Sequence, residues 1–453
     1  MNKGDDTVKR VLIANRGEIA LRIIQTCKRM GIETIAVYSE ADQDLPFVKE
    51  ATKAVCIGEA PVQKSYLRAD EIIRVAKEEQ VDAIHPGYGF LSENTAFAKA
   101  VMDEGIGFIG PSPEVIQLMG DKVTARDVMK QAQVPVVPGS EGSVESLEEA
   151  CRIAREIGYP VMLKASGGGG GIGMHRCEGE DELKKIYAST KGRAKAYFGN
   201  DELFIEKFIT NSRHIEVQVF GDKHGNLVHM FERDCSVQRR NQKVIEESPS
   251  PFLSEKGRAV MCQTAVDAAK AVGYYNAGTI EFIVDEQENY YFLEMNTRLQ
   301  VEHPVTEELT GLDLVKWQIL VERGEKLPLV QEEITQVSHA IEYRVYAEDP
   351  TTFLPSPGLI TSLEFPEQEG VRADLGYLSN QKVTPFYDPM IAKVIISGKT
   401  REESIERSKG FFNSASIEGI KTNLSLFQHV LQDEAFVNGE YETSYLSKRS
   451  IKN

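Results

Sequence analysis

The sequence predicts a multidomain protein of mixed α/β and α+β class, with an open parallel sheet first and antiparallel strands later. Three observations lead to this prediction. Strand and helix patterns alternate through residues 8–109, five glycines at 167–171 lie between two strand patterns, and residues 279–296 have the pattern of a β-hairpin. At 453 residues the chain is too long for one compact core, so we expect about two to four domains.

Composition narrows the class of protein. The net charge of −17 argues against a nucleic-acid partner or an anionic membrane surface. No apolar segment is long enough to span a bilayer, and the N-terminus carries charges where a secretory signal needs an apolar run. The six cysteines form no CxxC pair, which favours reduced thiols over disulfides or zinc. We expect a soluble, cytoplasmic protein.

The N-terminal pattern is strand, turn, helix, strand. An apolar strand at 8–14 is followed by a turn, by a helix whose apolar face runs from Ile19 to Cys27, and by a strand at 32–38. The unit recurs up to residue 109, which predicts a parallel sheet with helices on both faces. Because Gly17 is the only glycine of the first turn and no GxGxxG follows, we do not expect a nicotinamide cofactor.

The loop HPGYGFLSEN, residues 85–94, follows directly on a predicted strand. Its two glycines and its proline fit a loop at the carboxyl end of the sheet, where ligands of open α/β folds bind. A rigid connector without a ligand is the alternative.

A helical linker at 113–131 and a proline-containing stretch at 135–138 separate this domain from a smaller one. Lys122 lies in the linker helix, where a lone lysine is ordinarily a solvated surface charge. Met129-Lys130 resembles the core of a biotin-acceptor site. An acceptor lysine needs an exposed hairpin tip, however, and this lysine lies in a helical pattern, so it is not a predicted acceptor.

The smaller domain contains the glycine run. Ser146 and a glutamate three residues later form a capping box that starts a helix. A strand at 160–165 then carries Lys164 just before the glycines, and a short strand follows at 174–177. Bare backbone N–H groups beside a cation suit an anion. No GK[ST] follows, so we predict a mobile flap that covers phosphates rather than a Walker loop, with a flexible linker as the alternative.

Two polar strands and a basic cluster come next. A strand at 203–208 carries Glu206 and Lys207, and residues 214–219 alternate again. The segment 232–243 is the densest basic cluster of the chain. Its position just ahead of an acidic hairpin favours an anion pocket over an ordinary charged surface.

The hairpin sets two carboxylates against each other. Centring its turn on 286–289 pairs Asp285 with Tyr290 and, further out, Glu281 with Glu294. Like charges directly opposite each other repel, so this register needs a cation between them, and oxygen ligands suit Mg²⁺ or Mn²⁺. The other face carries the predicted core residues Ile280, Phe282, Val284, Tyr291, Leu293 and Met295.

The alternation continues beyond the hairpin. If the chain stays extended, one face carries Glu294, Asn296, Arg298, Gln300 and Glu302. A solvated edge strand would also alternate, but five functional groups of mixed sign favour a catalytic face. The hairpin therefore predicts a metal site that runs into an anion site.

The remainder begins with a predicted strand at 339–348, in which Glu342, Arg344 and Glu348 lie together. Taken alone, Arg344 is then a cation satisfied by one of these glutamates. Short strands follow, including 385–396, and the chain ends in helices.

Together these segments resemble the biotin carboxylase subunit of bacterial acyl-CoA carboxylases, which belongs to the ATP-grasp superfamily. The resemblance covers nearly the whole chain. Pyruvate and propionyl-CoA carboxylases share these motifs but often continue into a carboxyltransferase or a carrier with an AMKM site, so we expect a stand-alone subunit. The motifs are VLIANRGEIA, HPGYGFLSEN, KASGGGGG, ERDCSVQRR, GTIEF, EMNTRLQVEHPVTE, AEDP and YDPMIAK.

The resemblance implies an ATP-grasp fold with a Rossmann-like N-terminal domain, a lid with the glycine-rich flap, and a mixed C-terminal domain. In this family ATP phosphorylates bicarbonate to carboxyphosphate, which supplies CO₂ to biotin on a separate carrier protein. The expected domains are 1–112 (Rossmann-like), 113–136 (helical linker), 137–207 (lid), 208–335 (catalytic part) and 336–453 (C-terminal domain).

Residue by residue, the resemblance assigns roles to most of the polar groups above. Glu302 is the implied base for bicarbonate and Arg344 the implied stabiliser of the biotin enolate. The implied metal ligands are Glu281, Glu294 and Asn296. The bicarbonate pocket comprises Lys243, Arg298, Gln300 and the Val301 backbone, and Tyr88 approaches biotin. The implied ATP-binding residues are Lys122, Lys164, Gly168, Gly169, Gly170, Glu206, Lys207, His214, Gln238 and Asn241.

Two positions depart from the family pattern. Ile172 stands where a basic residue is frequent, and Asn241 where a histidine is common, so ATP affinity and flap closure are the properties we expect to differ. One rival function is an ATP-grasp ligase for urea or a free amine. Another is a nucleotide-binding regulator without catalysis, which would need no bicarbonate base such as Glu302.

The implied partners are a biotin carboxyl carrier protein, carboxyltransferase subunits and a second copy of the chain in a homodimer. The implied pathway is acetyl-CoA carboxylation for fatty acid synthesis. Propionyl-CoA, methylcrotonyl-CoA and pyruvate carboxylases are the alternatives, since the transferase selects the final acceptor.

Overall fold

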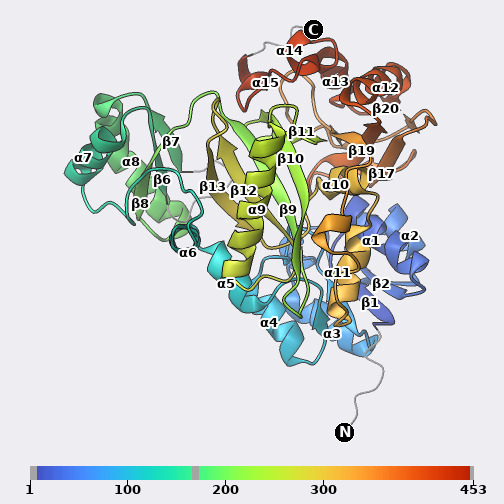
Figure 1. Cartoon of the computed structure of the whole chain (residues 1–453). Helices are drawn as coiled ribbons and strands as arrows, with labels where there is room; N and C mark the ends of the chain where they lie inside the picture. Colours follow the sequence, from blue (N-terminus) through green and yellow to red (C-terminus); the bar gives the residue numbers. More distant parts are fainter. Residues whose placement is uncertain (1–7, 166–172, 449–453) are drawn as a thin grey trace.

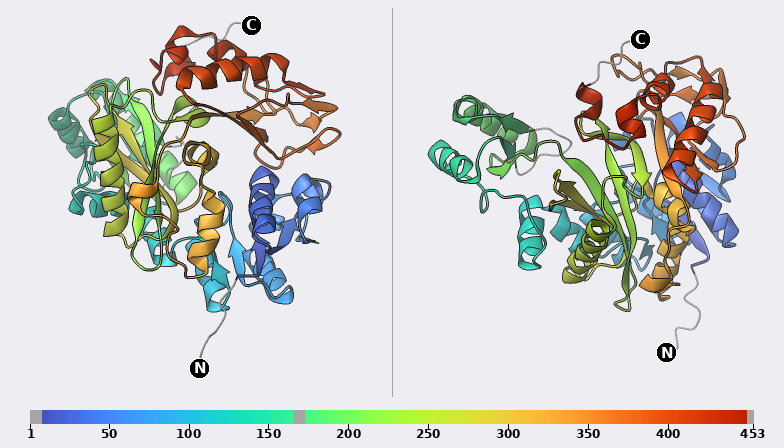
Figure 2. Two further views of the ribbon diagram at one scale, coloured as in Figure 1. Left: turned by 45° about the vertical axis from the view of Figure 1, so that its right-hand side comes forward. Right: turned by 45° about the horizontal axis from the view of Figure 1, so that its top comes forward.

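The computed structural model describes residues 8–165 and 173–448 (Figure 1). Figures 1 and 2 show a small lid at one side of a large central sheet, with the N-terminal and C-terminal parts at the other side. In these residues no helix combines the length and the apolar character that crossing a membrane requires.

The N-terminal part is a five-stranded sheet in the order β3-β2-β1-β4-β5, and all its pairings are parallel. The predicted parallel sheet is confirmed. The prediction missed the edge strand β3, whose half-exposed residues give only a weak apolar pattern. The elements are β1 (Arg10–Ile13), α1 (Gly17–Arg29), β2 (Glu33–Tyr38), α2 (Pro46–Glu50), β3 (Lys53–Cys56), α3 (Ala69–Glu78), β4 (Ala83–His85), α4 (Thr95–Asp103) and β5 (Gly107–Phe108).

The linker contains two helices where one was predicted. Helix α5 (Pro113–Gly120) ends one residue before Asp121, and α6 (Lys122–Gln131) begins directly after it. The Asp121 carboxylate accepts a hydrogen bond from the Thr124 N–H, which caps α6. Lys122 therefore lies at the very start of a helix, next to the cavity described below.

The lid is a three-stranded antiparallel sheet covered by two helices. Its strands are β6 (Val161–Ala165), β7 (Met174–Cys177) and β8 (Leu203–Lys207), in the order β7-β6-β8, and its helices are α7 (Leu147–Ile157) and α8 (Glu180–Phe198). Ser146 caps α7 as predicted, but the Glu149 carboxylate accepts from the Glu145 N–H rather than closing the box on Ser146. The predicted flap, with Gly168, Gly169, Gly170 and Ile172, lies outside the described residues.

One eight-stranded antiparallel sheet joins the middle of the chain to its C-terminal part, in the order β13-β12-β9-β10-β11-β14-β19-β17. The link is the pairing of β11 with β14, which lie far apart in the sequence. The strands are β9 (Arg213–Gly221), β10 (Leu227–Arg239), β11 (Gln242–Ser248), β12 (Asn276–Val284), β13 (Tyr290–Asn296), β14 (His339–Tyr346), β17 (Val371–Leu375) and β19 (Met390–Gly398).

Helices and short strands complete this part. The predicted helix at 305–323 is two helices, because Gly311 takes a left-handed conformation (φ 72°) and ends the first. The helices are α9 (Glu255–Ala271), α10 (His303–Thr310), α11 (Leu314–Glu322), α12 (Arg401–Ser414), α13 (Leu424–Val430), α14 (Glu434–Val437) and α15 (Tyr445–Lys448). The short strands are β15 (Gly358–Leu359), β16 (Ser362–Glu364), β18 (Lys382–Val383) and β20 (Ser416–Glu418).

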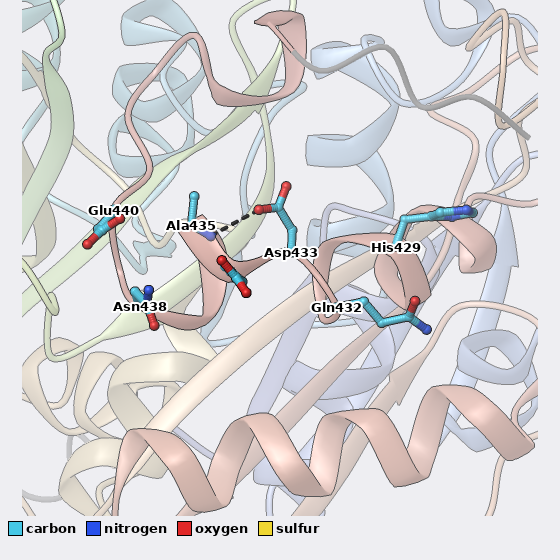
Figure 3. Close-up of a pocket in the computed structure, with 7 residues that line it drawn as sticks. His429, Gln432, Asp433, Ala435, Asn438 and Glu440 are labelled. Carbon is cyan, nitrogen blue, oxygen red and sulfur yellow. Dashed lines mark hydrogen bonds between the residues drawn. The ribbon is translucent and has the colours of Figure 1, made fainter.

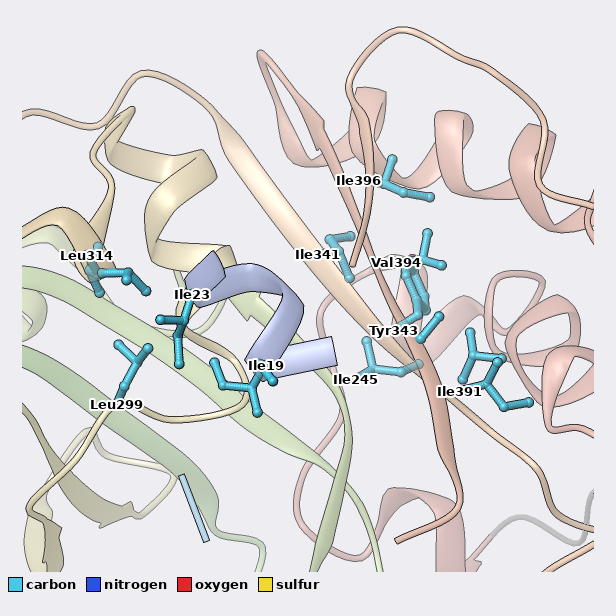
Figure 4. Close-up of a cluster of buried hydrophobic side chains, with 14 of the residues drawn as sticks. Ile19, Ile23, Ile245, Leu299, Leu314, Ile341, Tyr343, Ile391, Val394 and Ile396 are labelled. Carbon is cyan, nitrogen blue, oxygen red and sulfur yellow. The ribbon is translucent and has the colours of Figure 1, made fainter. Parts of the chain in front are cut away.

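The largest apolar core crosses the boundaries between these parts. Figure 4 shows Ile19 and Ile23 of α1 near Leu299 and Leu314, with Ile341 and neighbouring residues of the large sheet beyond. The N-terminal sheet is thus bound to the large sheet by continuous apolar packing. The lid has a separate core of its own, to which α7, α8 and β6 to β8 contribute.

Candidate active site

A cavity of about 560 Å³ lies between the lid and the large sheet. Its walls come from α6, β6 and β8 on the lid side and from β9 to β14 on the sheet side. It brings together the predicted residues Lys122, Lys164, Glu206, Lys207, His214, Gln238, Asn241, Lys243, Glu281, Glu294, Asn296, Arg298, Gln300, Val301, Glu302 and Arg344. Tyr88 does not line it; its ring lies 5.9 Å from the Lys393 Nζ atom.

A second hollow lies at the C-terminal helices (Figure 3). It is lined by residues around α13 and α14, including His429, Asp433 and Glu440. None of its residues belongs to the predicted site, and we assign it no function.

The hairpin has the predicted pairing of Glu281 with Glu294, but the predicted pairing of Asp285 with Tyr290 is wrong. Val284 pairs with Tyr290 instead, and a register shift next to Phe282 inserts one extra residue into β13. The bulge restores the alignment of the two glutamates. It also reverses part of the predicted face: Phe292 is buried in the core, whereas Leu293 is exposed.

Beyond the hairpin the predicted extended strand is wrong, because β13 ends at Asn296 and residues 297–302 form no regular element. The polar side chains of this segment nevertheless line the same cavity. Its two ends are held by long-range contacts: the Thr297 N–H donates to Glu93, and Lys393 Nζ donates to the Val301 carbonyl over 2.9 Å.

Glu281 sits among four nitrogen donors. Its carboxylate lies 2.7 Å from His214 Nε2, 2.9 Å from Lys243 Nζ and 2.8 Å from each of the Asn296 and Gln300 side-chain amides. Burial alone would raise the pKa of Glu281, but Lys243 and His214 outweigh burial and hold that pKa well below its usual value. Glu281 is therefore an ionised carboxylate at neutral pH.

The opposing carboxylate, Glu294, has fewer cations near it than Glu281 has. Partial burial and the opposed Glu281 carboxylate raise the pKa of Glu294, and its one ion pair among the described residues is with Lys122 Nζ at 3.8 Å. The Glu294 carboxylate, the opposed Glu281 carboxylate and the Asn296 amide oxygen line one cavity, and together they are a donor set that fits a hard divalent ion such as Mg²⁺. The direct pairing of Glu281 with Glu294, and the single ion pair of Glu294 among the described residues, support this fit.

Lys243 is the centre of the anion site. Its Nζ atom lies 2.5 Å from Glu216, 2.7 Å from Glu302 and 2.9 Å from Glu281. Burial lowers the pKa of Lys243, but these three carboxylates outweigh it and raise that pKa well above its usual value. The ammonium is fully charged and its three donors are all in use, so an incoming anion must replace one of the carboxylates.

Glu302 lies between two cations. Its second oxygen is 3.0 Å from Arg344 Nη2, and although burial raises the pKa of Glu302, Lys243 and Arg344 hold it well below the usual value. The carboxylate is thus ionised and able to accept a proton. Expecting Arg344 to be satisfied by Glu342 or Glu348 was wrong: Arg344 contacts Glu246 at 2.5 Å, and Glu348 instead pairs with Arg239.

The nucleotide side of the cavity is built from lid and sheet together. Lys164 Nζ donates to Glu206, and Lys207 Nζ donates to the backbone carbonyls of Gly158 and Tyr159. His214 Nδ1 accepts a hydrogen bond of 2.7 Å from the Gln238 amide. Lys164 is thus held at the end of β6, immediately before the predicted flap.

Three family models match consecutive parts of the chain, and a curated relative matches it over nearly its whole length. The chain matches the model "Biotin carboxylase, N-terminal domain" at residues 7–116, "Carbamoyl-phosphate synthase L chain, ATP binding domain" at 121–330 and "Biotin carboxylase C-terminal domain" at 342–448. Biotin carboxylase 2 of Bacillus subtilis is 58% identical over 97% of this chain and 99% of its own length. The chain belongs to the biotin carboxylase family.

Solved structures of the biotin carboxylase family superpose closely on the chain. Biotin carboxylase of Campylobacter jejuni, solved as a β-γ-ATP complex, has a TM-score of 0.95 and 48% identity over 98% of this chain and 99% of its own. The biotin carboxylase domain dimer of Hydrogenobacter thermophilus 2-oxoglutarate carboxylase has a TM-score of 0.93 and 48% identity over 97% of both chains. That structure contains MgADP, ADP and bicarbonate.

Some residues at this biotin carboxylase site were not predicted from the sequence. Glu216 accepts hydrogen bonds from both Lys243 and Arg233. Its position between His214 and Gln218, on a strand that alternates, could have indicated that it belongs to the site. Glu93 and Lys393 gave no such signal, since their partners lie far away in the chain.

Proposed function

We propose that the chain catalyses the ATP-dependent carboxylation of biotin, with bicarbonate as the carboxyl donor and carboxyphosphate as the intermediate. The observation that carries this proposal is the buried triplet Lys243–Glu302–Arg344, which places an ionised base between two cations in the same cavity as the paired acids Glu281 and Glu294. The similarity of the chain to the biotin carboxylases of Bacillus subtilis and Campylobacter jejuni supports the proposal.

The nucleotide side supplies cations and positioning. Lys122 and Lys164 are the cations for the ATP phosphates, and Glu206, Lys207, His214, Gln238 and Asn241 line the rest of the proposed nucleotide site. Glu281, Glu294 and Asn296 would hold Mg²⁺ or Mn²⁺, which when bound neutralises phosphate charge. Gly168, Gly169 and Gly170 belong to the proposed flap over these phosphates.

Bicarbonate is the anion proposed for the pocket of Lys243, Arg298, Gln300 and the Val301 backbone. Glu302 removes its hydroxyl proton, the freed oxygen forms a bond to the γ-phosphorus, and ADP leaves. Because Glu302 is held ionised by Lys243 and Arg344, it is ready for this transfer without a prior protonation change.

Biotin is the proposed second substrate. Carboxyphosphate breaks into CO₂ and phosphate, the ureido nitrogen of biotin gives its proton to the released phosphate, and this nitrogen forms the bond to CO₂. Arg344 is positioned to stabilise the enolate that arises when the proton leaves, and its Nε–H group is buried without another partner in the described residues. Tyr88 is the residue proposed to approach the ureido ring.

The carrier of this biotin is proposed to be a biotin carboxyl carrier protein, with carboxyltransferase subunits as the further partners and acetyl-CoA as the final acceptor. Propionyl-CoA, pyruvate or 2-oxoglutarate carboxylation is an alternative, since relatives carry such names. Methylcrotonyl-CoA carboxylation is a further alternative, implied by the resemblance of the sequence. A homodimer is proposed because the related domain of Hydrogenobacter thermophilus was solved as a dimer.

Incorporation of labelled bicarbonate into biotin tests the function directly. We expect incorporation and ADP formation that both require ATP, Mg²⁺, bicarbonate and biotin. Turnover with urea or a free amine and none with biotin would show a different ligase. Tight ATP binding without any turnover would show a nucleotide-binding regulator instead.

A further inference from the structure

Glu93 joins the loop that carries Tyr88 to the anion pocket. It follows the glycines of the loop between β4 and α4, and its neighbour Asn94 caps α4 by accepting from the Phe97 N–H at 2.8 Å. The end of the loop is therefore fixed to its own helix, while the half-exposed Glu93 side chain contacts a segment more than two hundred residues further along the chain.

The contacts of Glu93 divide between its two carboxylate oxygens. Oε1 accepts from the Thr297 backbone N–H at 3.0 Å and from the Thr297 hydroxyl at 3.2 Å. Oε2 accepts from Arg298 Nε at 2.9 Å. One carboxylate thus fixes both the backbone and the following side chain of a segment that has no regular structure.

Arg298 is held on its other edge as well. Its Nη2 donates to the Asn296 Oδ1 atom at 2.8 Å, and its Nη1 donates to the Leu299 carbonyl at 3.3 Å. Glu93 provides the only carboxylate paired with Arg298 among the described residues. Because an arginine has many rotamers, the Glu93 contact selects the one that places the guanidinium in the cavity.

We propose that Glu93 is a positioning residue for the bicarbonate pocket: it orients Arg298 and ties the pocket to the loop that carries Tyr88. The inference rests on the proposed function, since it assumes that Arg298 binds bicarbonate. Glu93 itself touches no substrate in this proposal; it acts through Arg298 and Thr297.

A Glu93→Gln variant tests this inference selectively. A glutamine oxygen still accepts from Thr297, but its amide nitrogen cannot accept from Arg298. We expect the KM for bicarbonate to rise about tenfold, which corresponds to loss of one charge-assisted hydrogen bond, with the KM for ATP and the Tm unchanged. Glu93→Asp, which keeps the charge on a shorter chain, should restore part of the loss.

Two further variants separate positioning from a structural role. Asn94→Ser keeps the helix cap next to Glu93 and should leave every kinetic constant unchanged. In an Arg298→Lys background, Glu93→Gln should add little, because the two residues act in one chain of contacts. An unchanged KM for bicarbonate in Glu93→Gln, or a rise in KM for ATP together with a lower Tm, would overturn the inference alone. Absence of bicarbonate-dependent ADP formation by the unsubstituted enzyme would overturn the proposed function, and the inference with it.

Discussion

Glu246 and Glu247 are neighbours on β11, yet their side chains meet different arginines and take opposite protonation behaviour. Burial and the Glu302 carboxylate, only partly offset by Arg344, raise the pKa of Glu246 to about 7. Burial also acts on Glu247, but Arg401 and His339 outweigh it and lower the pKa of Glu247 to about 2. One strand thus carries a carboxyl that contacts the active-site residue Arg344 and a carboxylate that contacts Arg401 of the C-terminal helix α12.

Glu247 should stabilise the fold at neutral pH and lose that effect in acid. Its folded pKa lies below its unfolded value, so the stabilisation is present above pH 4.5 and is lost as pH falls toward 2. The shift corresponds to about 3 kcal/mol. The apparent melting temperature of Glu247→Gln should be lower than wild type at pH 7, and the difference should shrink toward pH 3. A constant difference would contradict this account.

Glu246 should act in the opposite direction. Its folded pKa lies above its unfolded value, so the folded state retains a proton that the unfolded chain has lost between pH 4.5 and 7. Its contribution to stability is therefore greatest below pH 4.5 and falls as pH rises to 7. Melting temperatures of wild type and Glu246→Gln, compared across this window, should show a smaller decline in the variant. An equal decline in both proteins would exclude Glu246 as its source.

Glu302→Gln should abolish turnover and keep nucleotide binding. The amide cannot accept the bicarbonate proton, so bicarbonate-dependent ADP formation should fall by at least about a hundredfold. ATP-analogue binding, measured by fluorescence, should change little. The matched control is Glu308→Gln, which should remain active. Glu308 lies in helix α10, which begins directly after Glu302, but does not line the cavity. Activity near wild type in Glu302→Gln would remove Glu302 from the mechanism.

Glu294→Gln should weaken metal binding without harming the fold. The side chain is partly exposed and its ion pair with Lys122, at 3.8 Å, is exposed as well, so the substitution removes a metal ligand rather than a buried ion pair. The concentration of Mg²⁺ that gives half-maximal thermal stabilisation with an ATP analogue should rise about tenfold or more. Tyr291→Phe, on the same strand but not in the cavity, should show the wild-type concentration. The same value in both variants would argue against Glu294 as a ligand.

Local patterns predicted much of this molecule, and long-range contacts account for the rest. The alternation of Glu281 and Glu294 with apolar neighbours is visible in the sequence, and it positions them correctly. The bulge at Leu293 and the helix break at Gly311 were not foreseen, since the packing around each position decides them. Glu93 could not be assigned from the sequence, because only the folded chain brings it to Arg298.

The separate apolar core of the lid has a consequence for how substrates enter. The lid's cluster shares no residue with the clusters beneath the large sheet in the described part of the chain. If the lid rotated as one rigid body, its own apolar core and the cores beneath the large sheet would stay packed. The rotation would change chiefly the polar contacts that cross the cavity. The side chains on the large sheet, among them Lys243, Glu281 and Glu302, would keep their geometry while the entrance to the cavity widens.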